Sequence, residues 1–516
     1  VGTLSSTNFS TLDSSQIGTL SATQVAGLNS TQLTNLTTTD VAEFTSTQLG
    51  SFSATQISNL SVTNFSALDS NQIAGLSTTQ IGRLGTTQVA GLNETDIAEL
   101  STTQLSALSS TQIGALTTTS FSALDATQMG GLTVTQLRGM TTTQVGGLTT
   151  GDIAELTSTQ LGSLSATQLN AFSTTNMNTL DATQLGGLTS TQLGRLTGTN
   201  LSALDSVQIQ SLTTTQTAGL ATTQIAGLST TDVNELADTQ IASLTATQIA
   251  AFSTTNFSAL DATQVSGLTT TQISGLSTTL IRGLNETDIA ELSTTQVGTL
   301  SSTQIGALTT TAFNAFDATQ IQTLTATQLR GVTTTQVGAL TTTDIAELTS
   351  TQLGTLATTQ IGALTTTNMS ALDLTQVSGL TSTQIGRLSA TNLSALDASQ
   401  ISSLTATQVS GLAATQISGL STTDINEFAD TQIAGFSATQ MAALSVTNFS
   451  QLDATQVSGL TTTQVSALTS TVMRGLNETD VAEFSTTQLG ALSGTQIGSL
   501  TTTAFSALDT TQVQAL

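Results

Sequence analysis

The sequence predicts an all-α solenoid, a superhelix of very short capped helices with one helix in each octapeptide repeat. Three observations predict it. The motif L-[ST]-x-T-Q-[apolar]-x-[small]-L, as in residues 76–84, runs through all 516 residues without insertion or deletion. Each repeat carries two signatures of a helix start. Its apolar residues are spaced for a helix rather than for a strand. So strict a period indicates one supersecondary unit stacked on copies of itself.

The second half of each repeat (octad) predicts the start of a helix. We number the octad from its apolar residue: position 1 is apolar, 2 and 3 are small, 4 is Leu, 5 is Ser, Thr or Asp, 6 varies, 7 is Thr and 8 is Gln, Asp or Asn. Positions 5 to 8 form a capping box, in which the N-cap and N3 side chains each accept from the other's backbone amide. Position 4 and the next position 1 are the two sites of a hydrophobic staple.

The rest of the octad predicts how the helix ends and packs. We expect a helix of about two turns over positions 6, 7, 8, 1, 2 and 3, ended by the small residues, which also permit close approach of the next turn. Position 1 is apolar throughout except at Thr217. Such short helices are unstable alone, so each must press against its neighbours. The Thr and Gln of positions 7 and 8 are expected to form a ladder that satisfies backbone groups between turns.

A β-solenoid is the alternative fold, because Thr, Val and Ile favour strands. The apolar positions 1 and 4 have opposite parity, so they would point to opposite faces of one strand unless a turn lay between them. The repeat has no G-G-x-G-x-D pattern, which disfavours a calcium-binding β-roll.

Composition excludes several classes of function. The chain has 7 Arg and no Lys against 32 Asp and Glu, for a net charge of −25, and it has no Cys, His, Pro, Trp or Tyr. This charge predicts no nucleic-acid partner. No run of 18 apolar residues exists, so no membrane insertion is expected. We expect a secreted or cell-surface location from the composition. The chain starts and ends in the repeat register, which indicates a segment of a longer polypeptide or a mature chain whose ends dock onto other copies.

Two kinds of acidic octad mark a higher period. The first has Asp at position 5, and its members are spaced by 7, 7, 7 and 3 octads: Asp13, Asp69, Asp125, Asp181, Asp205, Asp261, Asp317, Asp373, Asp397, Asp453 and Asp509. The second has Asp at position 8 and Glu at the next position 3, spaced by 7, 7 and 10 octads.

Both series repeat after 24 octads, or 192 residues. We therefore predict one continuous solenoid over residues 1–516, or 64.5 octads, with super-repeats at 1–192, 193–384 and, partially, 385–516. If marked octads face one side, seven turns hold 24 octads, or about 3.4 octads per turn; tandem duplication alone is the alternative. Roughly 19 such turns would make a rod about 150–190 Å long.

The acidic octads also supply the candidate metal ligands. In three copies of Asn-Glu-Thr-Asp a third carboxylate joins the pair, and we single out Glu94, Asp96, Glu99, Glu286, Asp288, Glu291, Glu478, Asp480 and Glu483 as candidates for low-affinity Ca²⁺ binding. Carboxylates and hydroxyls are the ligands that Ca²⁺ takes. The alternatives are a solvated acidic face and pairing with Arg of an adjacent turn or subunit. No other cofactor is expected.

The motif L-[ST]-x-T-Q-[IV]-x-[GA]-L, tiled end to end, resembles the low-complexity octapeptide repeats of very large secreted bacterial surface proteins, including adhesin-like ones. The resemblance covers the whole chain and transfers no functional residue. It implies an extracellular structural or adhesive role.

Nothing in the chain predicts an enzyme or a small-molecule substrate, because no His or Cys is present and no Ser lies in a nucleophile elbow. We expect a structural protein that self-associates into an extracellular filament or biofilm-matrix fibre. The alternative is a spacer or adhesive stalk of a bacterial surface protein that binds a surface, a glycan or ice.

Overall fold

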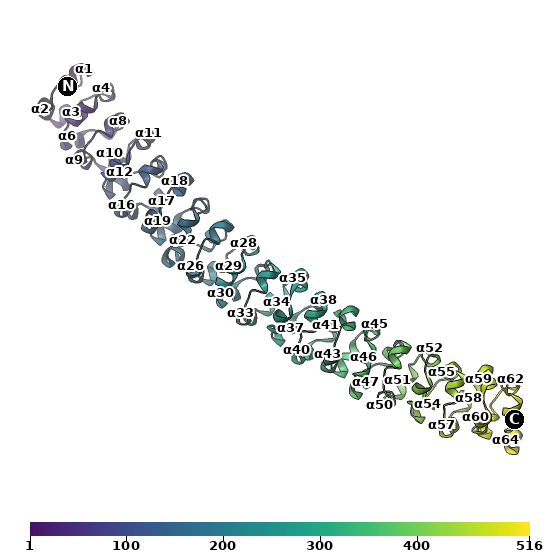
Figure 1. Cartoon of the computed structure of the whole chain (residues 1–516). Coiled ribbons are helices and arrows are strands. Elements are labelled where there is room, and N and C mark those ends of the chain that lie inside the picture. The colour runs from purple at the N-terminus through teal and green to yellow at the C-terminus, as the bar shows by residue number, and fades with distance from the viewer. The chain divides into compact units, whose positions relative to one another are not determined.

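The computed structural model describes all residues from Val1 to Leu516, and it is all-helical (Figure 1). It contains 64 helices of four to six residues and no strand, so the β-solenoid alternative is wrong. The chain divides into two compact units, Val1–Gly267 and Leu268–Leu516, which are described separately. The octad register continues unbroken through both.

The helices of the first unit begin at position 6 of an octad and end at position 1, 2 or 3. They are α1 (Ser6–Phe9), α2 (Ser14–Gly18), α3 (Ala22–Ala26), α4 (Ser30–Thr34), α5 (Thr38–Ala42), α6 (Ser46–Ser51), α7 (Ala54–Ser58), α8 (Val62–Phe65), α9 (Ser70–Ala74), α10 (Thr78–Gly82), α11 (Thr86–Ala90), α12 (Glu94–Ala98), α13 (Thr102–Ser106), α14 (Ser110–Ile113), α15 (Thr118–Phe121), α16 (Ala126–Gly131), α17 (Val134–Leu137), α18 (Thr142–Gly146), α19 (Thr150–Glu155), α20 (Ser158–Ser163), α21 (Ala166–Leu169), α22 (Thr174–Thr179), α23 (Ala182–Gly186), α24 (Ser190–Leu193), α25 (Gly198–Leu201), α26 (Ser206–Ser211), α27 (Thr214–Ala218), α28 (Thr222–Ala226), α29 (Thr230–Glu235), α30 (Asp238–Ser243), α31 (Ala246–Ile249), α32 (Thr254–Phe257) and α33 (Ala262–Gly267).

The helices of the second unit follow the same rule. They are α34 (Thr270–Ser274), α35 (Thr278–Gly283), α36 (Glu286–Ala290), α37 (Thr294–Thr299), α38 (Ser302–Ala307), α39 (Thr310–Phe313), α40 (Ala318–Thr323), α41 (Ala326–Gly331), α42 (Thr334–Gly338), α43 (Thr342–Glu347), α44 (Ser350–Thr355), α45 (Thr358–Ile361), α46 (Thr366–Ser370), α47 (Leu374–Gly379), α48 (Ser382–Ile385), α49 (Ala390–Leu393), α50 (Ala398–Ser402), α51 (Ala406–Ser410), α52 (Ala414–Ser418), α53 (Thr422–Asn426), α54 (Asp430–Ile433), α55 (Ala438–Ala443), α56 (Val446–Phe449), α57 (Ala454–Ser458), α58 (Thr462–Ser466), α59 (Ser470–Gly475), α60 (Glu478–Ala482), α61 (Thr486–Leu489), α62 (Gly494–Ile497), α63 (Thr502–Ser506) and α64 (Thr510–Ala515).

The predicted capping box starts these helices. In α10 the Ser77 hydroxyl accepts from the backbone N–H of Gln80, and the Gln80 side-chain oxygen accepts from the backbone N–H of Ser77 at 2.7 Å. Where the N-cap is Gly85 or Ala221, only the returning bond from the N3 side chain forms, because these residues have no oxygen to accept the other.

The helices end differently from our expectation. The prediction assigned the ending to small residues at positions 2 and 3 in the manner of a glycine cap, yet no residue, glycine included, has a positive φ. Instead the Leu at position 4 leaves the helix in an extended conformation, as Leu164 does after α20, and its amide closes the last turn onto the residue three before it. The small residues at positions 2 and 3 allow neighbouring turns to pack closely. A Cβ on Gly82 would lie 2.9 Å from the carbonyl oxygen of Ala107, in the next turn.

Within each unit, helices pack against the third helix along the chain, so α10 contacts both α7 and α13. Positions 1 and 4 are buried almost without exception and form the core. Thr217, the one polar residue at position 1, is fully buried and donates its hydroxyl to the carbonyl of Thr213. The expected staple residues Leu76 and Ile81 are both buried.

The Gln at position 8 joins consecutive turns. Its side-chain nitrogen in Gln80 donates to the carbonyl oxygens of Leu49 at 2.9 Å and Phe52 at 2.8 Å, which lie 31 and 28 residues earlier. Both carbonyls lie at the C-terminal end of α6. That of Leu49 also accepts from the backbone N–H of Phe52 at 3.1 Å, so Gln80 supplies its second donor. The Gln half of the predicted ladder is thus confirmed, whereas the Thr half is wrong, because Thr79 at position 7 faces solvent.

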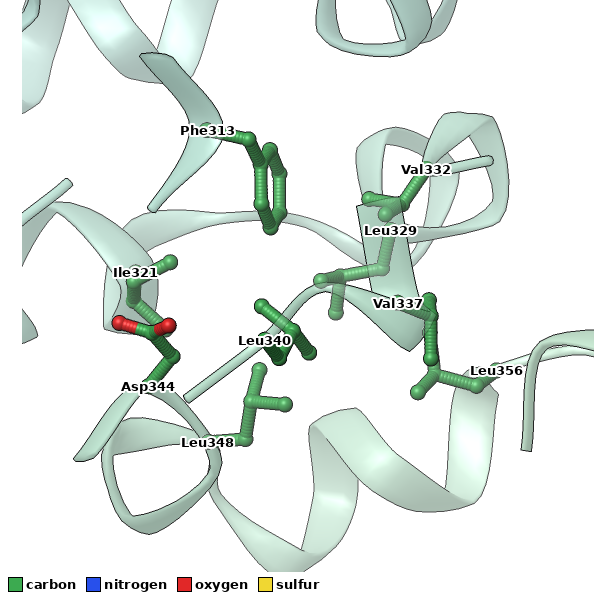
Figure 2. Close-up of a pocket in the computed structure, with 9 residues that line it drawn as sticks. All are labelled: Phe313, Ile321, Leu329, Val332, Val337, Leu340, Asp344, Leu348 and Leu356. Carbon is green, nitrogen blue, oxygen red and sulfur yellow. The ribbon is translucent and has the colours of Figure 1, made fainter. Parts of the chain in front are cut away.

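One enclosed apolar cavity of about 10 Å³ lies in the second unit. Figure 2 shows Phe313, Leu329 and Leu340 around it, with Val332 beside them. Val332 stands at position 4, where the repeat usually has Leu, so the shorter side chain leaves the gap. A cavity this small and apolar is expected to stay dry.

Candidate functional site

The acidic residues of the Asn-Glu-Thr-Asp octads do not share one environment. Asp96 is buried at N3 of α12, Glu94 is exposed at N1, and Glu99 is half-buried at the C-cap. The second and third copies repeat this division: Asp288 and Asp480 are buried, Glu286 and Glu478 are exposed, and Glu291 and Glu483 are half-buried.

The buried Asp is held by hydrogen bonds from two helices. One Asp96 carboxylate oxygen accepts from the backbone N–H of Asn93 at 2.8 Å and from the hydroxyl of Ser66 at 2.7 Å. Ser66 ends α8 in the preceding turn, 30 residues earlier. Asp480 has the same two partners, in Asn477 and Ser450. Because Asp cannot donate, the Ser hydroxyl provides the link between turns that Gln provides elsewhere.

The Glu of the pair lies close to carboxylates of two turns. Burial raises the pKa of Glu99, and the neighbouring carboxylates of Asp96 and Asp69 raise it further. Asp69 is the N-cap of α9, in the first kind of acidic octad. Burial likewise raises the pKa of Glu483, with Asp480 and Asp453 as the charged neighbours. The structure therefore brings together the two kinds of acidic octad that the sequence shows as separate series.

The proximity of the two kinds of acidic octad can be recognised in the sequence once the two series are combined. Each octad of the second kind begins 24 residues after one of the first kind, as Asn93 follows Asp69. Merged in chain order, the acidic octads succeed one another at intervals of three or four octads throughout. Helices three octads apart, such as α9 and α6, make contact in neighbouring turns. Figure 1 shows α9, α16 and α26, three helices capped by Asp, along one side of the first unit.

Four polar side-chain atoms are buried without a hydrogen-bond partner, and they occupy equivalent places in the two units. They are Ser122 Oγ and Glu155 Oε2 in the first unit, and Asn314 Oδ1 and Glu347 Oε2 in the second. Glu155 follows Ser122 by 33 residues, and Glu347 follows Asn314 by the same number. The two pairs are one super-repeat of 192 residues apart. Ser122 and Asn314 occupy the place from which Ser66 donates to Asp96, but neither forms a hydrogen bond to the buried Asp of the next turn.

The candidate metal ligands are not gathered into a ready site. No group of three or more His, Cys, Asp or Glu side chains is arranged to hold a metal ion. Ca²⁺ binding by Glu94, Asp96, Glu99 and their counterparts stays a prediction. Far-UV circular dichroism with and without Ca²⁺ tests it, and an unchanged spectrum and melting temperature in millimolar Ca²⁺ would contradict it.

The arginines lie on the exposed parts of positions 2 and 3. Arg138 donates from Nε to the backbone carbonyl of Ser163, in the next turn, at 3.1 Å. It therefore supports a contact between turns rather than an ion pair.

Sequence reasoning missed a pair of open grooves. One lies beside Glu286 and Ala312 and the other beside Glu478 and Ala504, at equivalent places 192 residues apart. The sequence shows the signal, since Ala312 and Ala504 stand where the repeat has Gln.

Comparison with known proteins places the chain among repeat proteins. The ALTTAQ repeat matches residues 89–126 and 121–158, two windows offset by four octads. No curated protein matches the chain. The longest helices have six residues and none could span a membrane. The chain is a helical repeat protein, and the part from residue 89 to residue 158 is similar to the ALTTAQ repeat.

Proposed function

We propose that this chain is a structural protein that self-associates into an extracellular filament or matrix fibre. The observation that carries the proposal is the Gln ladder. Where position 8 is Gln, its side-chain amide donates to carbonyls at the end of a helix in the preceding turn, as Gln80 does to Leu49 and Phe52. A fold whose units complete one another in this way grows by adding equivalent turns.

The remaining features support a mechanical rather than a chemical role. The enclosed cavity is too small for any ligand, and the residues that usually act as catalytic nucleophiles or bases, His and Cys, are absent from the chain. We propose that the chain is not an enzyme and has no small-molecule substrate. Its acidic, Lys-free and Cys-free composition supports a secreted or surface location.

The proposal includes the geometry of the turn. Hydrogen bonds between turns join residues 25 to 31 positions apart, as in Arg138 to Ser163 and Gln80 to Leu49. This spacing supports a turn of about 3.4 octads, or roughly 27 residues.

Electron microscopy tests the filament. We expect filaments whose number grows with protein concentration, and monodisperse particles at all concentrations would contradict them. A double variant, Val207→Thr with Leu374→Thr, is the control. These side chains are 72% and 50% exposed at positions that usually hold small or polar residues. Filaments that disappear in this variant would come from two adhesive apolar residues rather than from the repeat.

The alternative is a spacer or adhesive stalk, and the exposed hydroxyl groups favour it. Positions 5, 6 and 7 face solvent in octad after octad, as Ser77, Thr78 and Thr79 do. The chain thus presents a regular polar surface with few cations. Binding of the purified chain to cells, ice or polysaccharide, without filaments, would favour this function over the first.

A further inference from the structure

The seven arginines are all exposed, and none of them forms an ion pair within the chain. They are few among 32 Asp and Glu side chains: Arg83, Arg138, Arg195, Arg282, Arg330, Arg387 and Arg474. Arg138 donates to the backbone carbonyl of Ser163, and the other six guanidinium groups have no hydrogen-bond or ion-pair partner in the chain. Side chains of opposite charge are therefore kept apart in the fold.

The acidic octads of successive turns stack on one another within each unit. In the second unit α40, which is capped by Asp317, contacts α43, which carries Asp344 and Glu347. The carboxylates of Asp317 and Glu347 are near enough to interact across the two turns. In the first unit α16, which is capped by Asp125, contacts α19 in the same way. The chain thus completes about one turn between two acidic octads, and their carboxylates lie on one side of the unit.

An arginine lies halfway along the turn between such octads. Arg330 follows Asp317 by 13 residues and precedes Asp344 by 14. Because one turn separates the two Asp residues, about half a turn separates Arg330 from each of them. Arg138 has the same place between the acidic octads of α16 and α19. These arginines therefore lie on the opposite side of their unit from the carboxylates.

The same spacing recurs at other arginines. Arg83 follows Asp69 by 14 residues and precedes Asp96 by 13. Arg195 and Arg387 also follow the Asp caps of α23 and α47 by 14 residues. Figure 1 shows α35 and α59, which carry the two remaining arginines of the second unit, on the opposite edge of that unit from the Asp-capped α40, α50 and α57. We call these two sides of a unit the arginine side and the acidic side.

We infer that the chain binds a second copy of itself side by side, with the arginine side of a unit in one copy against the acidic side of a unit in the other. The Asp caps have room for such a partner. One oxygen of the exposed Asp317 carboxylate accepts from Thr319 and Gln320, and the other oxygen has no partner in the chain. Guanidinium groups pair with carboxylates in a planar, charge-assisted arrangement.

The spacing of the charges along the chain favours a second copy over a smaller cation. Arg83, Arg138 and Arg195 are 55 and 57 residues apart, or about two turns of roughly 27 residues. Carboxylates recur on the acidic side in every turn, so each arginine meets one when the two copies are in register. A single exposed ion pair contributes little, but pairs held on one body act together.

The two faces of this contact differ, so it is not closed. A copy that uses its arginine side still presents its acidic side, and further copies can add to it. The net charge of −25 on each copy opposes close approach. Salt of about 0.15 M screens charges more than about 8 Å apart and leaves close pairs intact, whereas about 1 M salt also weakens the pairs. We therefore expect association at the lower salt concentration and its loss at the higher.

The inference rests on the proposed self-association and adds that copies associate through their sides. Analytical ultracentrifugation and electron microscopy of the full chain test it, with side-by-side pairs and bundled filaments as the expected result. Filaments that stay single would overturn the inference and leave the proposed filament intact. Side-by-side pairs without filaments would support the inference and count against the filament, and monomers at all concentrations would overturn both.

Two variants with the same net charge of −30, five below that of the parent, test the place of contact. The first removes the arginine side with Arg83→Gln, Arg138→Gln, Arg195→Gln, Arg330→Gln and Arg387→Gln. The second adds to the acidic side, at exposed first positions of Asp-capped helices, with Ser70→Glu, Ala126→Glu, Ala182→Glu, Ala318→Glu and Ala398→Glu.

We expect side-by-side association to be at least tenfold weaker in the first variant and no weaker in the second, with the circular dichroism spectrum unchanged in both. Equal weakening in the two variants would overturn the inference, because it would reflect general repulsion. Unchanged association of the first variant would overturn it as well. A parent chain that stays single but binds a lysine-rich peptide would overturn it in favour of another cationic partner.

Discussion

At the scale of single residues, the Gln of position 8 combines two tasks that are usually separate. Its oxygen closes the capping box of its own helix, and its nitrogen satisfies the end of another helix one turn earlier. Asn performs the second task less fully, because its shorter side chain reaches a single carbonyl, as Asn64 reaches that of Leu36. Four of the eight Asn residues at this position precede Phe, as Asn64 precedes Phe65, and there the larger ring makes up the lost volume in the core.

Replacing this Gln should destabilise the stack locally. We expect Gln80→Ala to cost roughly 2–4 kcal/mol, because the Phe52 carbonyl loses its side-chain donor, the Leu49 carbonyl keeps only the backbone N–H of Phe52, and the Ser77 amide loses its acceptor. Hydrogen exchange at the Ser77 amide, which Gln80 protects, should become faster. The matched control is Thr79→Ala, an exposed neighbour whose loss should cost no more than about 0.5 kcal/mol. Equal effects of the two substitutions would contradict the ladder.

At the scale of the element, each helix depends on its caps and on close approach to its neighbours. A helix of four to six residues is far below the length that is stable alone. The small residues of positions 2 and 3 allow contact between backbones, as at Gly75, where a Cβ would lie 2.8 Å from the carbonyl oxygen of Ser46. Larger residues at such sites would push the turns apart.

The cavity beside Val332 offers a test of packing between helices. We expect Val332→Leu, which restores the usual residue of position 4, to raise the free energy of unfolding by up to about 1 kcal/mol, since one more methylene is buried. Leu340→Ala should lower the free energy of unfolding by about 2–5 kcal/mol, since it enlarges the same cavity. Thermal unfolding measures both. A destabilising Val332→Leu would mean that the surrounding helices cannot accept the added group.

At the scale of the whole molecule, acidic residues recur in neighbouring turns, and their mutual repulsion makes stability depend on pH. Burial, with nearby Asp carboxylates, raises the pKa of several Glu side chains in the folded chain: Glu43, Glu99, Glu155, Glu235, Glu347, Glu427 and Glu483. Such a group binds its proton more readily in the folded chain than in the unfolded chain. Protonation of these residues therefore stabilises the fold.

We expect the melting temperature to rise as the pH falls from 7 towards 4.5, the ordinary pKa of Glu. The gain is complete below 4.5 and is lost as the pH rises through the folded pKa values. At lower pH the trend should reverse, because hydrogen bonds from Gln320 and Thr319 lower the pKa of the Asp317 cap below its ordinary 3.8, so that its contribution is lost as it protonates.

The control for the pH dependence is Glu155→Gln with Glu347→Gln, chosen because one oxygen of each carboxylate is buried without a partner. This variant should be more stable than the parent at pH 7 and should respond less to acid. A melting temperature that falls steadily from pH 7 to pH 5, or an equal response in parent and variant, would contradict the role of these residues.

Much of the local structure follows from the sequence alone. The start of each helix depends on neighbouring residues, since the N-cap and N3 side chains act over three positions and the apolar spacing defines one face, whereas the way the helices end was predicted wrongly. The capped start of α10 at Ser77 follows from the residues of its own octad and the Leu on either side. The sequence also showed which residues were exceptional, among them Thr217, Ala312 and the acidic octads.

What these exceptional residues contact depends on the packing of one turn on the next. The partners of Gln80 and Asp96 lie 28 to 31 residues earlier, and their identity depends on how far one turn advances, which no single octad encodes. For this reason the acidic octads form two separate series along the chain, whereas in the fold Asp69 lies near Glu99. The groove at Ala312 could not be predicted from the sequence either. The absence of the usual Gln side chain affects the turn against which that side chain would have packed.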